Sequence, residues 1–222
     1  MKRSIIIEAP AKINLILDIK GKRPDGYHEL VTVMHQVNLC DRLFMEEYDE
    51  GIVVASDNDS LPRREGNLAY RAAQLILEKF GQKAGVKIFI EKNIPVAAGL
   101  AGGSTDAAAV LMGINELYAL AVPQEELMRL GLTLGSDIPY CLAGSPLREK
   151  DSRIMAPAGV TCLARGRGEI LSPLPSVCLQ EILIVKPDFQ LSTAEVYGGY
   201  RDNEVTDRPD IELFLQAWRQ HD

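Results

Sequence analysis

The sequence predicts an α+β protein. Strand-like segments fill the first part of the chain, and helical segments are interleaved with strands further on. Residues 12–20 (KINLILDIK) alternate between apolar and other side chains with the period of two that is typical of a strand, which places Lys12 and Asn14 on one face. Residues 105–120 instead show helical spacing. The apolar face expected for that helix consists of Ala107, Val110, Leu111, Ile114 and Leu117.

Further strands are predicted from the same kind of pattern. Residues 4–20 are expected to form one or two strands, and residues 86–95 (VKIFIEKNIP) a strand that runs directly into a glycine-rich loop. Residues 31–39 and 42–48 are expected to form two strands joined around Cys40-Asp41, and residues 51–56 a shorter strand. Further along the chain, residues 164–170 are expected to form a turn followed by a strand, and residues 181–188 (EILIVKPD) a buried strand.

The helices carry start and stop signals. Asn67 is expected to cap a helix over 68–80, and Gly81 lies just past its end. Pro123 suits the first turn of a helix that ends before Gly135. A short helix is expected within 192–200 and an amphipathic helix from residue 211 onward, whereas residues 145–158 (SPLREKDSRIMAPA) are polar, lack a period and are interpreted as a surface loop.

Composition narrows the class of protein. A net charge of −7 argues against general affinity for nucleic acid or an anionic membrane. The N-terminus develops no signal-peptide core, and no apolar run approaches the roughly 18 residues of a membrane span. The four cysteines are scattered without a C-x-x-C pair, which argues against zinc and suits a reducing cytoplasm. His28 and His35 would face opposite sides of one strand, so a shared metal is not expected.

Residues 94–109 (IPVAAGLAGGSTDAAA) place three glycines, Gly99, Gly102 and Gly103, at the start of a helix. Glycine often serves only to turn the chain, so a tight helix entry is one interpretation. The other is an anion site, because a helix N-terminus has unpaired N–H groups and a partial positive charge. A Walker P-loop is excluded, since no G-K-[ST] follows, and the fit to a dinucleotide fingerprint is poor. Ser104 and Thr105 add hydroxyls that can donate hydrogen bonds or hold a metal ion.

Two pairs of polar residues are candidates for chemistry. Asp137 lies in the turn GSDIP, where it could be a helix cap, and Lys12 could be a solvated edge charge. If they meet, the ammonium keeps the carboxylate charged, and the carboxylate can accept a hydroxyl proton as a phosphoryl group arrives. Tyr27 and His28 could be ordinary turn residues, or they could stack on a nucleobase and hydrogen-bond to its edge.

Three segments together resemble one family. PAKINLILDIKGKRPDGYHEL, IPVAAGLAGGSTDAAA and LGSDIPYCLAG, in this order and spacing, are similar to the signatures of the 4-diphosphocytidyl-2-C-methyl-D-erythritol kinases, within the GHMP kinase superfamily. The middle segment indicates the superfamily, and PAKINL with the GYHE loop indicates the family. The resemblance covers most of residues 5–144 and returns at LARGRGEI and KPDFQLSTAEVY.

The resemblance implies a catalytic pair and an ATP loop. Lys12 and Asp137 match the catalytic residues, with Asp137 as the base and Lys12 orienting it and the developing charge. The matching loop has amides that surround the phosphates of ATP while Mg²⁺ bridges them. Its residues are Pro95, Val96, Ala97, Ala98, Gly99, Leu100, Ala101, Gly102, Gly103, Ser104 and Thr105. Family members often carry glycine where this chain has Ala97, Ala98 and Ala101.

The resemblance also implies the acceptor. Asn14 and His28 match positions that hold the methylerythritol and cytidine parts of the substrate, and Tyr27 and Tyr197 match the aromatics that sandwich the cytosine ring. The implied reaction moves the γ-phosphoryl group of ATP to the 2-hydroxyl of this small molecule, which carries a cytidine diphosphate group. That step belongs to the non-mevalonate route to isoprenoids, and neither nucleic acid nor a membrane is an expected partner.

The implied architecture has two domains. Residues 1–174 match a domain like ribosomal protein S5 domain 2, with 145–158 as an insertion, and residues 175–222 match part of a ferredoxin-like domain. Family members continue beyond the last residue of this chain and supply a third glycine-rich motif of the G-S-G type, which is not found after Tyr200. Two alternatives to the kinase therefore stand: a non-catalytic nucleotide-binding remnant, or a GHMP kinase for another acceptor alcohol.

Overall fold

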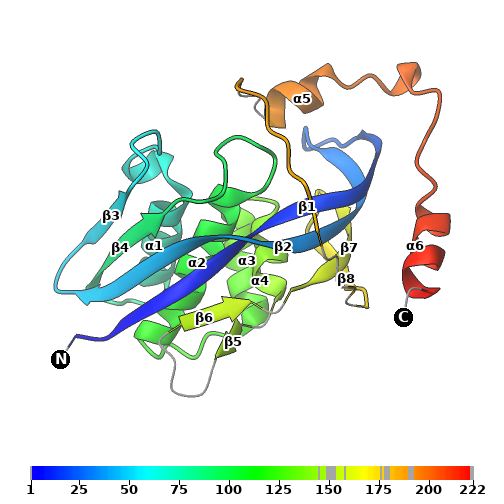
Figure 1. Cartoon of the computed structure of the whole chain (residues 1–222). Helices are drawn as coiled ribbons and strands as arrows, with labels where there is room; N and C mark the ends of the chain where they lie inside the picture. Colours follow the sequence, from blue (N-terminus) through cyan, green and yellow to red (C-terminus); the bar gives the residue numbers. More distant parts are fainter. Residues whose placement is uncertain are drawn as a thin grey trace. The chain divides into compact units, whose positions relative to one another are not determined.

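A computed structural model describes residues 2–144, 146–148, 154–157, 159–175, 177, 181–189 and 193–220. Contacts divide the chain into two compact units, each assembled from separate stretches of sequence. Unit 1 comprises Met1–Ala11, Val37–Ile94 and Ala101–Ala158, and unit 2 comprises Lys12–Gln36, Pro95–Leu100 and Gly159–Asp222. Two long strands, β1 (Ser4–Lys22) and β2 (His28–Tyr48), contribute to both units (Figure 1). The predicted domain boundary after residue 174 remains a prediction.

Unit 1 contains a mixed sheet. Its strand order is β3-β4-β2-β1-β6-β5, and its shorter strands are β3 (Ile52–Ser56), β4 (Gly85–Glu91), β5 (Pro146–Arg148) and β6 (Ile154–Pro157). β4 runs antiparallel to β2, whereas β3 runs parallel to β4 and β6 parallel to β1. The register places Phe44 of β2 opposite Phe89 of β4. Both rings lie on the face that is more open, with exposed fractions of 38% and 40%.

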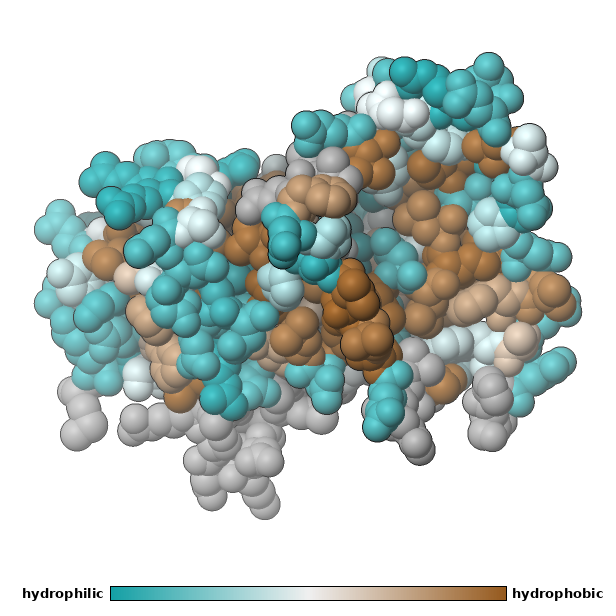
Figure 2. Space-filling model, turned by 45° about the horizontal axis from the view of Figure 1, so that its top comes forward, coloured by the Kyte–Doolittle hydropathy of each residue, from teal (hydrophilic) through white to brown (hydrophobic). Residues whose placement is uncertain are grey.

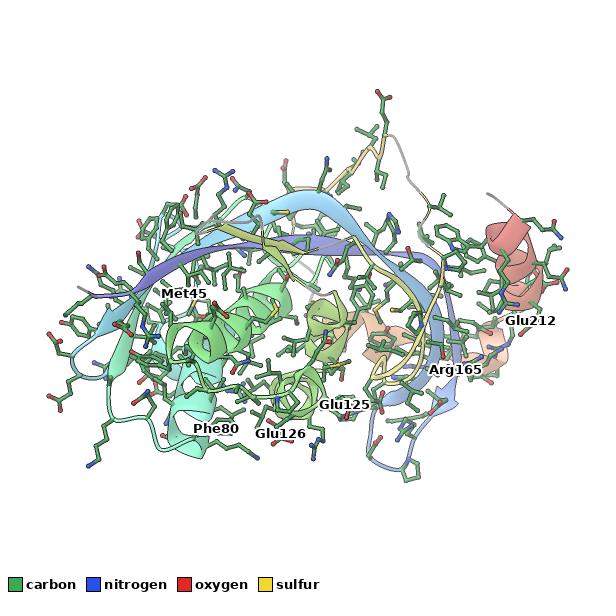
Figure 3. The ribbon with its side chains drawn as sticks, turned by 90° about the horizontal axis from the view of Figure 1, so that it is seen from below. Met45, Phe80, Glu125, Glu126, Arg165 and Glu212 are labelled. Carbon is green, nitrogen blue, oxygen red and sulfur yellow. The ribbon has the colours of Figure 1, made fainter. Side chains whose placement is uncertain are left out.

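Four helices cover the other face of this sheet (Figures 1 and 3). They are α1 (Leu68–Lys79), α2 (Gly102–Leu117), α3 (Gln124–Leu134) and α4 (Ile138–Ala143), and they pack on one another. Met45, labelled in Figure 3, extends from β2 to α2, where a Cβ atom on Gly113 would overlap with its sulfur. Glycine at this position therefore lets the helix approach the sheet closely.

Unit 2 is built on the remaining parts of β1 and β2. β7 (Thr161–Gly166) pairs antiparallel with β2 from Leu30 to His35 and forms a hairpin with β8 (Ile170–Pro173). Helix α6 (Ile211–Gln220) packs Ile211 and Leu215 against Val33 and Leu163. Unit 2 also contains helix α5 (Thr193–Gly199) and the 3₁₀ turn η2 (Asp202–Glu204). A further 3₁₀ turn, η1 (Arg64–Gly66), belongs to unit 1.

Several predictions of local structure are confirmed. The Asn67 side chain accepts a hydrogen bond from the amide of Ala69, 2.9 Å away, and α1 is followed by Gly81 at φ +63°. α3 begins after Pro123 and ends at Gly135. The expected apolar face of α2 is buried throughout, as are the apolar residues that β4 turns toward the helices. None of the helices in the described ranges is long and apolar enough to cross a bilayer.

Three predictions of strands and loops are wrong. Residues 31–39 and 42–48 belong to one continuous strand, β2, because Cys40 and Asp41 keep an extended backbone between two sets of partners. Segment 145–158, expected to be a loop, contributes β5 and β6, since the edge of β1 at Ile6 and Ile7 offers hydrogen-bonding groups to residues 154 and 155. The remaining residues of that segment lie outside the described ranges.

The third wrong prediction is the buried strand at 181–188. This segment has no strand structure, and the exposed fractions of Leu183 and Val185 are 89% and 81%. An apolar run can be buried as a strand only where a neighbouring strand pairs with it, and none does so in the described part of the chain. Apolar side chains are correspondingly visible on the surface shown in Figure 2.

Candidate active site

The glycine-rich loop connects the end of β4 to the start of α2. Left-handed backbone occurs at Ala97 (φ 54°), Gly99 (φ 72°) and Ala101 (φ 60°), which turns the chain sharply into the helix. The amide of Thr105 donates to the carbonyl of Ala101 at 2.9 Å, the first hydrogen bond of the helix. The amides of Gly102, Gly103 and Ser104 precede it, and a helix start leaves such N–H groups without partners in the helix. These amides can therefore bind an anion.

Lys12 is connected to this loop through its backbone. Its amide donates a hydrogen bond of 3.1 Å to the carbonyl of Leu100, and both residues belong to unit 2. The Lys12 ammonium donates to Asn14 Oδ1 at 3.3 Å, so these two side chains share a face as the strand period predicts. Asn14 Oδ1 also accepts from Thr32 Oγ1 at 3.3 Å. The strand thus places a buried cation and a polar amide next to the end of the loop.

Asp137 occupies the N-cap position of α4 but does not act as a cap. Its side chain makes no capping hydrogen bond to the helix. Nearby, Ser104 Oγ lies 4.0 Å from the position that a Cβ atom on Gly135 would take, so the start of α2 and the turn carrying Asp137 are neighbours within unit 1. Lys12 belongs to unit 2, and the predicted pairing of Lys12 with Asp137 remains a prediction.

Aromatic rings gather in unit 2. His28 stacks on Tyr197 with centroids 5.2 Å apart, and Tyr200 meets the edge of the same imidazole at 5.9 Å. Tyr27 is half exposed, and the guanidinium of Arg167 lies over its ring at 4.3 Å. The predicted sandwich of a cytosine between Tyr27 and Tyr197 remains a prediction. Sequence reasoning assigned no role to Tyr200 or to Arg167, although Arg167 lies in a segment that was predicted as a turn and strand.

An ionic cluster ties the segment after α5 to β1. The Arg208 guanidinium donates to Asp18 Oδ1 at 2.9 Å, to the carbonyl of Ile19 at 2.7 Å and to Asp202 Oδ1 at 2.6 Å. Burial raises the pKa of Asp18, but hydrogen bonds from Lys20 and Arg208 outweigh burial, and that pKa lies below its ordinary value. Tyr200 Oη adds a bond to the carbonyl of Ile19 at 3.1 Å. These contacts anchor the chain that carries the aromatic rings.

The predicted magnesium ion remains a prediction, and unit 1 can be examined for oxygen atoms that could hold it. No cluster of three His, Cys, Asp or Glu side chains that could hold a metal occurs in the described residues. Mg²⁺ in nucleotide sites is bound by one or two protein oxygens together with phosphates and water. The Ser104 hydroxyl, which lies close to Gly135, is one protein oxygen of that kind.

Comparison with known proteins identifies the family. Residues 67–145 match the family profile described as GHMP kinases N terminal domain. The whole chain is 53% identical to the 4-diphosphocytidyl-2-C-methyl-D-erythritol kinase of Syntrophomonas wolfei and covers 73% of that protein. The chain belongs to the 4-diphosphocytidyl-2-C-methyl-D-erythritol kinase family. The kinase of that name from Exiguobacterium sibiricum is 44% identical over 220 residues, 99% of this chain and 71% of its own length.

A solved structure agrees with this family. The crystal structure of a 4-(cytidine 5'-diphospho)-2C-methyl-D-erythritol kinase is 38% identical and superposes with a TM-score of 0.71 over 98% of this chain and 71% of the other. The expected GHMP kinase fold is therefore confirmed, as is the predicted α+β class. The relatives are kinases, which confirms the predicted enzyme class of a small-molecule kinase, whereas a phosphate-binding role of the glycine-rich loop remains a prediction.

Proposed function

We propose that this chain transfers the γ-phosphoryl group of ATP to the 2-hydroxyl of 4-diphosphocytidyl-2-C-methyl-D-erythritol, giving the 2-phosphate and ADP in the non-mevalonate route to isoprenoids. The names and identities of its relatives favour this function over a non-catalytic remnant or another acceptor alcohol. The structural observation that supports it most is the hydrogen bond from the Lys12 amide to Leu100, because it holds the strand of the proposed catalytic lysine against the proposed phosphate loop. A cytoplasmic location remains a prediction.

Positioning and charge stabilisation account for the proposed chemistry. Phosphoryl transfer needs reactants held in line and donors that meet the charge on the phosphate oxygens. The amides of Gly102, Gly103 and Ser104 at the start of α2 bind the phosphates in this proposal. Mg²⁺, when bound with the nucleotide, would neutralise charge on the phosphates, with Ser104 among the residues that hold it. Asp137 accepts the proton of the attacking hydroxyl, and Lys12 stabilises the charge that develops beside it.

The cytidine end of the acceptor is assigned to unit 2. His28 offers ring nitrogens that can hydrogen-bond the base edge, and Tyr27 and Tyr197 offer ring faces for stacking. Asn14, whose side-chain oxygen accepts from Lys12, is assigned to the methylerythritol part. This arrangement would place the acceptor hydroxyl near Lys12 while the base is held by the aromatic rings.

Product formation tests the proposal directly. The purified chain is given Mg-ATP and the cytidine-bearing acceptor, beside Asp137→Asn and the matched control Asp59→Asn, which changes an exposed aspartate. The parent and Asp59→Asn should form the 2-phosphate. Asp137→Asn should lose about 10²–10⁴-fold in kcat, the range of general base catalysis, while still binding Mg-ADP.

Each alternative has its own outcome. Unchanged turnover in Asp137→Asn would remove the role assigned to that carboxylate. Saturable binding of ADP by a folded parent that forms no product would establish the non-catalytic remnant. Phosphorylation of another alcohol in preference to the cytidine-bearing one would establish a different acceptor.

A further inference from the structure

A buried cluster of three charged side chains lies at the two ends of the glycine-rich loop. Lys92 follows β4, Asp106 lies on the first turns of α2, and Asp41 comes from the middle of β2. All three belong to unit 1, as do Ile94 and Ala101, the residues that bracket the loop. The side chains of Lys92, Asp41 and Asp106 are 2%, 0% and 5% exposed.

Asp41 and Lys92 hold the chain that enters the loop. Asp41 Oδ1 accepts hydrogen bonds from the amides of Asn93, at 2.7 Å, and Ile94, at 2.8 Å. Asp41 Oδ2 forms an ion pair with the Lys92 ammonium. The last residues before the loop are therefore fixed by one carboxylate through three hydrogen bonds, two of them to the backbone.

The same ammonium holds the chain that leaves the loop. Lys92 Nζ donates to Asp106 Oδ2 at 2.9 Å. A Cβ atom on Gly102 would lie 3.2 Å from Lys92 Nζ and 3.2 Å from Ile94 Cγ2, so the first residue of α2 packs directly on this group. One buried cation thus joins the end of β4 to the beginning of α2.

Two simpler roles for this buried cluster, stabilisation of the fold and direct binding of a phosphate by Lys92, do not account for it well. A buried ion pair adds little net stability compared with apolar residues of the same size, because two charges lose their hydration. Burial, together with the neighbouring charge of Asp41, raises the pKa of Asp106, which expresses that cost. The Lys92 ammonium is enclosed by two carboxylates and has almost no exposed surface, so it is not available to a phosphate.

We propose that Lys92, with Asp41 and Asp106, is a positioning group that sets the separation of the two ends of loop 95–100 and thereby the placement of the α2 amides for nucleotide phosphates. The inference rests on the proposed function of that loop. A loop whose ends are fixed in advance loses less conformational entropy when it binds a ligand, and its donors need no rearrangement. Breaking the link at Asp106 should affect nucleotide binding and catalysis more than it affects folding.

Two substitutions at Asp106 separate positioning from packing. Asp106→Ala removes the acceptor that links α2 to Lys92 and leaves a neutral Lys92–Asp41 pair, so the variant should fold. Asp106→Asn keeps an oxygen that accepts from Lys92. Val110→Ala, at a buried position one turn further along the same helix, is the control for lost side-chain volume. The readouts are the Kd of Mg-ADP by calorimetry, the KM of the acceptor, kcat and Tm.

Asp106→Ala should weaken Mg-ADP binding about tenfold or more, the effect of misplaced binding groups, with little change in the KM of the acceptor. Asp106→Asn should bind Mg-ADP much as the parent does, and Val110→Ala should lower Tm without weakening nucleotide binding. Equal Kd values for Asp106→Ala and Val110→Ala, or an unchanged Kd in Asp106→Ala, would overturn the positioning role. Failure of the parent itself to bind Mg-ADP would instead contradict the proposed function.

Discussion

The imidazole of His28 stacks on the phenol ring of Tyr197, with the two planes inclined by 23° and the centroids 5.2 Å apart. His28 begins β2 and Tyr197 lies in α5, so a contact across most of the sequence defines this aromatic cluster. An imidazole held flat against a second ring is fixed in orientation, and its nitrogens keep a defined direction. That is the property required for recognition of a base edge by hydrogen bonds.

We expect Tyr197→Ala to weaken binding of the cytidine-bearing acceptor. Stacking of a base on an aromatic ring contributes about 1–3 kcal/mol, so the KM of the acceptor should rise roughly 5- to 150-fold. The KM of ATP should change little, because Tyr197 is assigned to the acceptor. Steady-state kinetics with each substrate varied in turn measures both values. Tyr197→Phe keeps the ring and serves as the control; a KM for the acceptor that is the same in the alanine variant and the parent would contradict the assignment.

We expect opposite effects from two alanine-to-glycine changes in the loop. Ala101 has φ 60°, a conformation that costs an alanine more than a glycine, so Ala101→Gly should raise the free energy of unfolding by about 0.5–1 kcal/mol. Ala98 is not among the described residues with positive φ, and Ala98→Gly should lower that free energy by about 0.5–1 kcal/mol through the entropy of the unfolded chain. Urea unfolding of both variants measures the difference. Effects of the same sign would show that backbone strain is not what distinguishes the two positions.

We expect the stability of unit 2 to depend on pH through His35. Its Nδ1 lies 2.7 Å from Thr161 Oγ1, its ring is 6.1 Å from that of Trp218 on α6, and burial lowers its pKa below the ordinary value. The unfolded chain therefore binds the proton more readily than the folded one, and protonation favours unfolding. The contribution of His35 should be complete above about pH 6.5, the pKa in the unfolded chain, and should be lost as the pH falls through the folded pKa.

Trp218 is the one tryptophan of the sequence, so its fluorescence reports on α6. Urea unfolding followed by the fluorescence of Trp218 should show a lower free energy of unfolding at pH 5.5 than at pH 7.5. His35→Gln retains a hydrogen-bonding side chain but does not titrate in this range, and its stability should fall less over the same interval. The same pH dependence in parent and variant would show that other groups are responsible.

We expect Cys40 and Cys162 to react slowly with alkylating reagents in the native protein. Burial raises the pKa of each thiol to about 11. Since the thiolate is the reactive form, only about one thiol in a thousand is reactive at pH 8, and labelling should be roughly a hundredfold slower than for an ordinary cysteine. Timed iodoacetamide treatment with peptide mass spectrometry measures the rates. The same chain in guanidinium chloride is the control, and rapid labelling of native Cys162 would contradict its burial.

Prediction from the sequence succeeded where the signal was local. The Asn67 cap and the end of α1 before Gly81 are each determined by a few adjacent residues, and both were predictable, whereas α2 begins at Gly102, three residues before the helical pattern. It failed where the outcome depended on a distant partner. Residues 181–188 have an apolar pattern but no pairing strand in the described residues, and residues 154–157 have little pattern but pair with β1.

The linear sequence was sufficient to predict the family, the α+β class, the glycine-rich loop and the candidates Lys12, Asn14, His28 and Asp137. Each follows from residue types at short spacings or from the order of three segments, information that the linear chain contains. The ion pairs of Lys92 with Asp41 and Asp106, and the stacking of His28 on Tyr197, became apparent in the folded chain alone. These contacts connect residues from different strands and helices, and charged side chains become buried only when folding encloses them with their partners.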